Sequence, residues 1–229
     1  MHHGENIHDY ESYLLNLAKC QTKEVNINVK NLTFYIRPSV FNPSIFDNGI
    51  EQFIDKITTG NGGSFLDFGC GCGIFGVFAA KNGYDNVVAL DINHEAIKST
   101  EKNANINNVT LKAIHSNLFK NLEDDVRFDT IFWHHPYNYE NNHKLEDKDP
   151  YISNLIDKDY KMLQDFLFYA PHYLNQGGVV YIVNGKEIGS RELFLERVRN
   201  SCFDFNLVSS FKKDGLSVDL FMLFLNPDS

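Results

Sequence analysis

An alternation of short apolar strands with helices, from about residue 64 to about residue 200, constrains the fold of this chain most. Stretches such as FLDF, VVALDI, FDTIFW and GGVVYIV are nearly continuous in apolar residues, and segments with helical spacing separate them. Strands that are apolar on both faces need cover on both faces, which is typical of a parallel sheet between two layers of helices. The pattern predicts strands over 64–69, 86–92, 109–114, 128–133 and 177–183, and helices over 74–81, 95–105, 159–174 and 191–200.

The C-terminal end adds two further strands, over 203–211 and 216–225. A short turn around Asp214-Gly215 joins them, so they cannot both be parallel members of the same sheet. We therefore expect an α/β fold with a doubly wound, Rossmann-like, mostly parallel seven-stranded sheet that finishes with an antiparallel C-terminal strand.

The N-terminal part has a different pattern. Residues 10–20 have apolar positions at helical spacing, and residues 25–36 alternate as in a β-hairpin. A helix over 44–57 follows, with Ser44 as its expected N-cap. We expect a helix-and-hairpin extension over residues 1–40 and the main domain over 41–229.

The composition limits the partners. The formal net charge is −9, and Lys212-Lys213 is the only adjacent pair of basic residues, so the sequence argues against a nucleic-acid partner. Cys70 and Cys72 are too close together for a metal site and have no second pair, which indicates reduced thiols and no metal. We found no apolar signal segment and no apolar run of membrane-spanning length, so we expect a cytoplasmic protein without a membrane partner.

The stretch LDFGCGCGIFG, residues 66–76, follows the first strand of the alternating region and opens a helix. Gly69, Gly71 and Gly73 allow a tight turn close to a ligand, and the helix N-terminus offers free N–H donors. Asp91, about 20 residues further on, ends the next strand, where a carboxylate can accept both hydroxyls of a ribose. A structural alternative is that Asp91 caps the following helix. Either NAD or S-adenosylmethionine would suit this arrangement.

Asp67 separates the two cofactors. An acidic residue immediately before the glycines would repel a pyrophosphate, whereas it suits a sulfonium or an α-ammonium group. The sequence therefore favours S-adenosylmethionine over NAD.

The motifs LDFGCGCGIFG, VVALDIN, SNLF and FDTIFWHHPY, in that order, resemble those of class I S-adenosylmethionine-dependent methyltransferases. The similarity is greatest to the subgroup with an Asn-Pro-Pro-Tyr motif, which includes release-factor glutamine methyltransferases and small-subunit rRNA guanine methyltransferases. The resemblance covers about residues 24–225. It implies a cofactor site formed by Phe41, Asn42, Asp67, Phe68, Gly69, Gly71, Gly73, Asp91, Ile92, Asn117, Leu118 and His134.

His-His-Pro-Tyr stands where the subgroup has Asn-Pro-Pro-Tyr, which places His134 at the Asn position and His135 at the first Pro. In the subgroup that Asn accepts hydrogen bonds from a planar –NH₂, whereas a neutral imidazole can also act as a base near neutral pH. We expect His134, Pro136 and Tyr137 to be the catalytic residues. The alternative for His134 is a buried structural histidine, and the role of His135 stays open.

From these observations we expect an enzyme that transfers a methyl group to a nitrogen or oxygen of a small-molecule acceptor, with a protein side chain as the other possible partner. The alternatives are a protein glutamine or rRNA N-methyltransferase, a non-catalytic cofactor-binding domain and an NAD-dependent oxidoreductase. The polar segment 138–157 is a candidate lid, with Tyr139, His143 and Tyr151 as possible substrate contacts.

Overall fold

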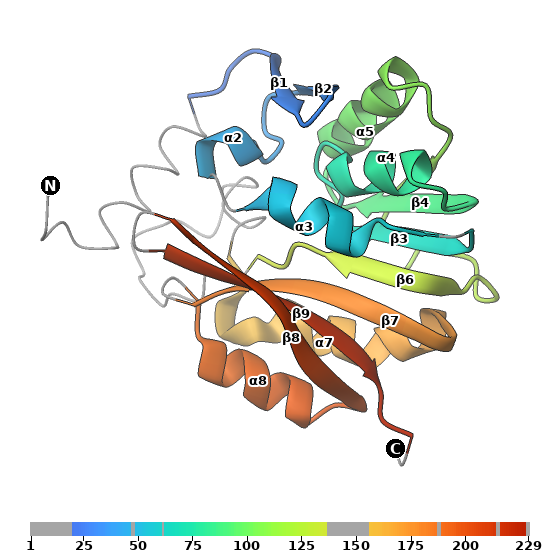
Figure 1. Cartoon of the computed structure of the whole chain (residues 1–229), viewed down its shortest axis with the longest axis vertical. Coiled ribbons are helices and arrows are strands. Elements are labelled where there is room, and N and C mark those ends of the chain that lie inside the picture. The colour runs from blue at the N-terminus through green and yellow to red at the C-terminus, as the bar shows by residue number, and fades with distance from the viewer. Residues whose placement is uncertain are drawn as a thin grey trace, which may run out of the picture.

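The structure, a computed structural model of the chain, describes residues 20–46, 49–60, 62–136, 156–186, 189–213 and 216–227. A seven-stranded sheet with the strand order β5-β4-β3-β6-β7-β9-β8 forms its centre (Figure 1). β5, β4, β3, β6 and β7 pair in parallel, whereas β9 is antiparallel to both of its neighbours. The predicted fold class is confirmed. The strands are β3 (Ser64–Phe68), β4 (Asn86–Asp91), β5 (Lys112–His115), β6 (Phe128–Trp133), β7 (Leu174–Gly185), β8 (Phe203–Lys213) and β9 (Leu216–Leu225).

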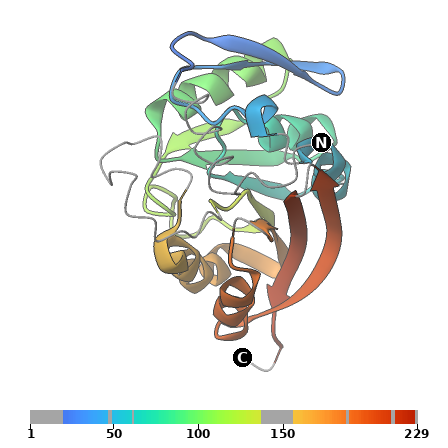
Figure 2. The same ribbon diagram turned by 90° about the vertical axis from the view of Figure 1, so that its left-hand side faces the viewer.

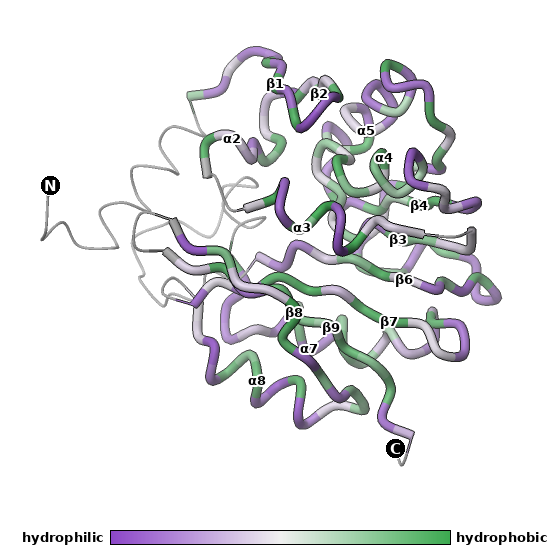
Figure 3. The backbone as a smooth tube through the Cα atoms, in the orientation of Figure 1, coloured by the Kyte–Doolittle hydropathy of each residue, from purple (hydrophilic) through white to green (hydrophobic). Residues whose placement is uncertain are grey.

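Helices cover both faces of the sheet. α3 (Ile50–Ile57), α4 (Ile74–Lys81) and α5 (His94–Ile106) lie on one face, and α7 (Lys161–Tyr169) and α8 (Arg191–Arg199) lie on the other. Successive residues of β3 enter different cores, since Phe65 packs with α3 and α4 while Leu66 packs with α7. Figure 3 shows hydrophobic residues concentrated along the central strands. Because helices cover both faces of these strands, their sequences are nearly continuous in apolar residues.

The helix predicted over 74–81 is observed with the same bounds. It begins after Gly73, whose φ of 79° lies in the left-handed region that favours glycine. A Cβ at Gly73 would also lie 2.8 Å from the Thr100 side chain. The glycine is therefore required both by its backbone conformation and by the packing of α4 against α5.

The predicted hairpin consists of β1 (Val25–Val29) and β2 (Leu32–Ile36), which pair antiparallel. It lies over α5 (Figure 2). Asn103 of α5 holds it there, because its Oδ1 accepts a hydrogen bond from Tyr35 N at 2.7 Å and its Nδ2 donates to Tyr35 O at 2.9 Å. The helix expected over 10–20 lies outside the described residues, and the division of the chain at residue 40 stays a prediction.

Several predicted boundaries were wrong. The single helix predicted over 44–57 was wrong: α2 covers Pro43–Phe46, and α3 begins separately after Gly49, whose φ is 73°. Ser44 is not an N-cap: Asn42 Oδ1 accepts from Ser44 N at 3.0 Å and takes that role. β5 begins at Lys112 rather than at 109, and β7 begins at Leu174 rather than at 177.

The helix predicted over 159–174 is three consecutive elements, with α7 between the 3-10 turns η1 (Lys158–Tyr160) and η2 (Ala170–Tyr173). Among the described residues, none of the helices has the length and apolar character needed to cross a bilayer.

Candidate active site

The glycine loop lies at the carboxyl end of β3, where parallel α/β sheets form their binding sites. Gly69, Gly71 and Gly73 all have positive φ, of 67°, 54° and 79°. Gly69 is exposed, and a Cβ placed on Gly71 would meet no atom within 4 Å. At Gly71 the loop therefore presents bare backbone to an open space, as a closely bound ligand requires.

Asp91 lies beside this loop at the end of β4. Its Oδ2 accepts a hydrogen bond from Gly71 N at 2.9 Å, and its Oδ1 accepts from Asn93 N at 2.8 Å. Burial raises the pKa of the carboxyl group, and the bonds from these backbone N–H groups oppose that shift. The N-cap of α5 is Asn93, which accepts from Glu95 N, so capping is not what Asp91 does.

Apolar and polar groups flank Asp91 at the ends of β4 and β5. Ile92 is 53% exposed, which is high for an isoleucine that follows a buried strand. His115 Nε2 lies 2.8 Å from Ile92 O and joins the two strand ends. Leu118 is half-buried with a φ of 50°, and the Asn117 side chain is exposed. Ile92 thus offers an exposed apolar side chain next to Asp91, and Leu118 packs against the core on the α7 side of the sheet.

Asp67 lies beneath the loop, with only 2% of its surface exposed. Its Oδ2 accepts a hydrogen bond from Gly76 N at 2.8 Å. Burial raises the pKa of this carboxyl group to about 8. The adjacent Phe68 points into the core against Phe119 and Phe166, with ring centroids 4.7 and 4.9 Å away, so the structure separates its side chain from the loop surface.

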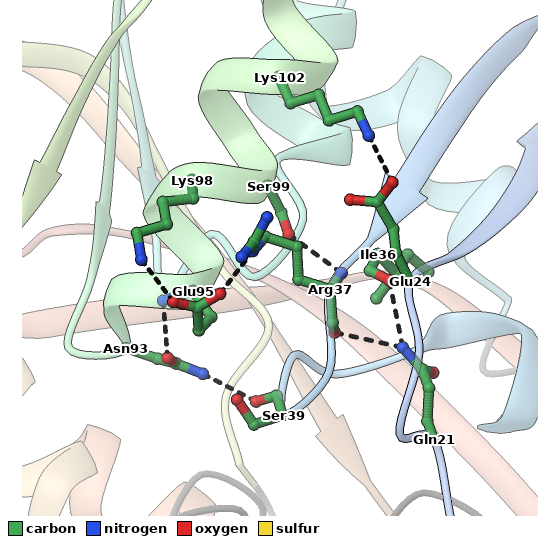
Figure 4. Close-up of polar contacts among 10 residues, drawn as sticks. All are labelled: Gln21, Glu24, Ile36, Arg37, Ser39, Asn93, Glu95, Lys98, Ser99 and Lys102. Atoms are coloured by element: carbon green, nitrogen blue, oxygen red, sulfur yellow. Dashed lines mark hydrogen bonds and ion pairs between the residues drawn. The ribbon is translucent and has the colours of Figure 1, made fainter.

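Hydrogen bonds attach a segment upstream of the glycine loop to Asn93 and Glu95, at the start of α5 (Figure 4). Asn93 Nδ2 donates to Ser39 O at 2.7 Å, and Arg37 Nε lies 2.5 Å from Glu95 Oε2. Further along, the buried Asn42 donates from Nδ2 to Gln21 Oε1 at 2.9 Å. The first two contacts fix residues 37–39 next to the N-terminus of α5.

This segment also reaches the end of β6. The Phe41 ring lies 6.0 Å from the His134 ring, between centroids. His134 is half-buried, and burial together with the neighbouring His135 lowers the pKa of its imidazole to about 4. His134 is therefore neutral at physiological pH and can accept a hydrogen bond.

His135 has a different environment, although it is the next residue. It is fully buried, and its Nε2 lies 3.0 Å from Oδ2 of the buried Asp157. Asp157 also accepts from Met162 N and Leu163 N, both at 2.8 Å, and so binds the first turn of α7. Burial lowers the pKa of His135, while Asp157 opposes that shift.

The pair of His135 and Asp157 joins the histidine motif to α7. Asp157 could not be recognised from the sequence, since 22 residues separate it from its partner His135. Pro136 is half-buried, and Tyr137 lies outside the described residues, as do Tyr139, His143 and Tyr151.

The model of a known family, described as the methyltransferase small domain, matches residues 31–212. The chain belongs to this family. It is therefore an S-adenosylmethionine-dependent methyltransferase, and the sequence-based recognition of the class I methyltransferases is confirmed. The NAD-dependent alternative is set aside by the same match.

Two relatives show which branches of the family are similar. The chain is 30% identical to a protein from Methanocaldococcus jannaschii named for protein N5-glutamine methylation, over 72% of this chain and 82% of that protein. It is 28% identical to ribosomal RNA small subunit methyltransferase C of Vibrio vulnificus, over 82% of this chain and 50% of that enzyme. The chain thus spans about half the length of the rRNA relative.

A solved structure has the same fold. It is the T. thermophilus 16S rRNA N2 methyltransferase in complex with AdoMet and guanosine, with a TM-score of 0.60 and 22% identity. The match covers 87% of this chain and 49% of that one.

The prediction from net charge that nucleic acid is not a partner is wrong for this family. Relatives of this chain are named for rRNA methylation, and the T. thermophilus protein was solved with guanosine. Net charge describes the whole surface, whereas contact with an acceptor depends on the local surface around the site. The comparisons also favour a macromolecular acceptor over the small molecule expected from the sequence.

Proposed function

We propose that the chain transfers a methyl group from S-adenosylmethionine to a planar –NH₂ group of a macromolecule, with His134 as the residue that orients this group. The observation that supports the proposal best is the state of His134, whose pKa is lowered to about 4 by burial. A neutral imidazole nitrogen can accept a hydrogen bond from an amide or an aromatic amine, as the oxygen of an asparagine side chain does.

The low pKa also selects among acceptors. An aliphatic ammonium has a pKa near 10.4, about six units above that of His134, so this imidazole is a poor base for removing its proton. A hydroxyl acceptor presents the same difficulty. A planar –NH₂ needs no such step, because its nitrogen carries no excess proton before it attacks.

The proton balance is consistent with this role. As the N–C bond forms and the C–S bond breaks, the acceptor nitrogen acquires a positive charge and becomes strongly acidic. Its proton then passes to His134 or to water, and a weak base is sufficient at that stage. The chain contributes mainly by holding the reactants in line, which can supply a large part of the rate enhancement.

The described residues fit the cofactor. We propose that Asp91 accepts the ribose hydroxyls and that Ile92 packs on the adenine beside Leu118 and Asn117. The backbone of Gly69, Gly71 and Gly73 would pass beneath the ligand, and the buried Asp67 would favour its positive charge. Phe41 would close the site on the side of His134, held by the buried Asn42.

Protein glutamine is the acceptor that we place first. The relative from M. jannaschii supports it, because this chain matches 82% of that protein and so resembles it over most of its length. An rRNA guanine is the second candidate. The rRNA methyltransferases among the relatives support it, but this chain matches only about half of the Vibrio enzyme.

A direct comparison of acceptors tests the proposal. The purified chain would be incubated with labelled S-adenosylmethionine and, separately, with glutamine-containing translation proteins and with unmethylated small-subunit rRNA. We expect label on a side-chain amide, located by mass spectrometry. Label on a guanine amino group would replace the first candidate by the second. Label on a lysine amine or a hydroxyl would overturn the role proposed for His134.

A further inference from the structure

Trp133 is the single tryptophan of the chain and the last residue of β6. Its side chain is 4% exposed and is surrounded by rings. The ring centroids of Phe166, His135 and Phe68 lie 4.5, 4.8 and 5.2 Å away. None of the residues that the structure describes accepts a hydrogen bond from its indole Nε1. This N–H is not among the fully buried unpaired atoms of the described residues, so the small exposed part of Trp133 includes a donor that is open to a ligand.

The indole edge that carries this N–H faces the cofactor loop. A Cβ placed on Gly69 would lie 3.3 Å from Trp133 Nε1 and 3.5 Å from its Cδ1. Gly69 is exposed and has a φ of 67°, so no side chain separates the indole from the space above the loop. The unpaired donor therefore lies at the floor of the proposed cofactor site.

The order of the strands shows which part of the cofactor passes this point. β3 lies between β4, which ends at Asp91, and β6, which leads to His134. A ligand with its ribose at Asp91 and its methyl group directed at His134 must cross the end of β3, where Gly69 lies. The amino-acid portion of the cofactor, attached to the same sulfur as the methyl group, belongs in this region.

That portion has an α-ammonium and an α-carboxylate. An indole N–H is a donor only, and an ammonium is also a donor only, so the two cannot form a hydrogen bond. We propose that Trp133 is a cofactor-binding residue whose Nε1–H donates to the α-carboxylate of S-adenosylmethionine. The inference rests on the proposed cofactor site but does not depend on which acceptor the enzyme methylates.

Binding of two cofactor forms tests this role without measuring activity. Calorimetric titrations would compare S-adenosylmethionine with its decarboxylated analogue, for the wild type and for Trp133→Phe. Phenylalanine keeps an aromatic ring in the core and removes only the donor. We expect Trp133→Phe to weaken S-adenosylmethionine binding by about tenfold or more, as is typical for a hydrogen bond to a charged group. Affinity for the decarboxylated analogue should not change.

Phe166→Leu is the matched control, because it disturbs the packing of Trp133 but leaves the indole donor in place. Its effect, if any, should be equal for the two ligands. In proteins that retain Trp133, either ligand should also change the tryptophan fluorescence. An equal loss of both ligands in Trp133→Phe, or no loss, would overturn the inference. Failure of the wild type to bind S-adenosylmethionine would overturn the cofactor site itself, whereas binding without methylation of either acceptor would count against the proposed function alone.

Discussion

Replacement of His134 distinguishes an orienting residue from a catalytic base. If His134 orients a planar –NH₂, His134→Asn supplies another acceptor and should keep most of the activity. His134→Ala leaves the donor without a partner, which costs about 1–3 kcal/mol. This corresponds to a loss of kcat/KM of roughly 5- to 150-fold. A general base would instead contribute about 10²- to 10⁴-fold, and asparagine would be nearly as poor as alanine.

The pH profile provides a second readout. If His134 were a catalytic base with the pKa of a free imidazole, the rate would rise with pH through about 6.5. Since the pKa of His134 is lowered to about 4, we expect the rate to be constant from about pH 6 to 8 and to fall only as the pH approaches 4. His134→Asn should remove this acidic limb.

The assay requires two controls. The folded protein favours neutral His134, whereas the unfolded chain binds a proton near pH 6.5, so this residue lowers stability as the pH falls from about 6.5 to 4. Circular dichroism should therefore confirm folding at each pH. His172→Asn, at an exposed histidine on η2, is the matched substitution and should leave the rate unchanged. A rate that rises through pH 6.5 together with an inactive His134→Asn would refute the orienting role, and a fully active His134→Ala would show that this histidine is structural.

Four further predictions concern three carboxylates. Asp91→Ala should weaken cofactor binding by about 1.5–3 kcal/mol, and equal calorimetric affinities would remove Asp91 from the site. Because the pKa of Asp67 is about 8, this residue is mostly protonated at pH 7, and a cationic cofactor should release close to one proton. Calorimetry in buffers of different ionisation enthalpy measures that release, and Asp67→Asn should abolish it. In the free protein, Asp67 should make stability decrease as the pH rises from about 4 to 8. Asp157→Ala should lower the free energy of unfolding by about 1–3 kcal/mol in urea titrations, because it leaves the buried His135 ring without its hydrogen-bond partner, whereas the exposed Asp125→Ala should have little effect.

The helix and strand boundaries that were predicted correctly are determined by residues close to them in sequence. α4 begins after a glycine with positive φ, and β6 and β9 are apolar runs with clear ends, so their bounds agreed with the structure. β5 was misplaced because the turn after α5 extends further than its residues suggest: Asn108 has a φ of 52°, and Val109 N donates back to Ala104 O. Strong β propensity at residues 109–111 did not outweigh that turn.

The composition of the site was harder to predict where partners are distant in sequence. The spacing of Asp91 after the glycine loop identified it, and the structure places the two in contact. Asp157 and Trp133 gave no such signal, because their roles depend on how α7 and β3 pack against β6. Phe68 shows the opposite error, because it was included as a neighbour of Asp67 in sequence. Successive side chains of a strand point to opposite faces of the sheet, so Phe68 lies in the core on the other face from Asp67.

The two histidines of His-His-Pro-Tyr replace two residues of the subgroup motif in different ways. A proline at position 135 would restrict the backbone through its own ring and would need no partner. A histidine gives no such restriction, and its buried ring nitrogen requires an acceptor, which Asp157 provides together with an anchor to α7. His135 and Asp157 therefore act as one unit, and Asp157 would have no equivalent use beside a proline. In the role that we propose for His134, an imidazole nitrogen would replace the amide oxygen of asparagine, and the neighbouring His135 would hold the backbone that positions it.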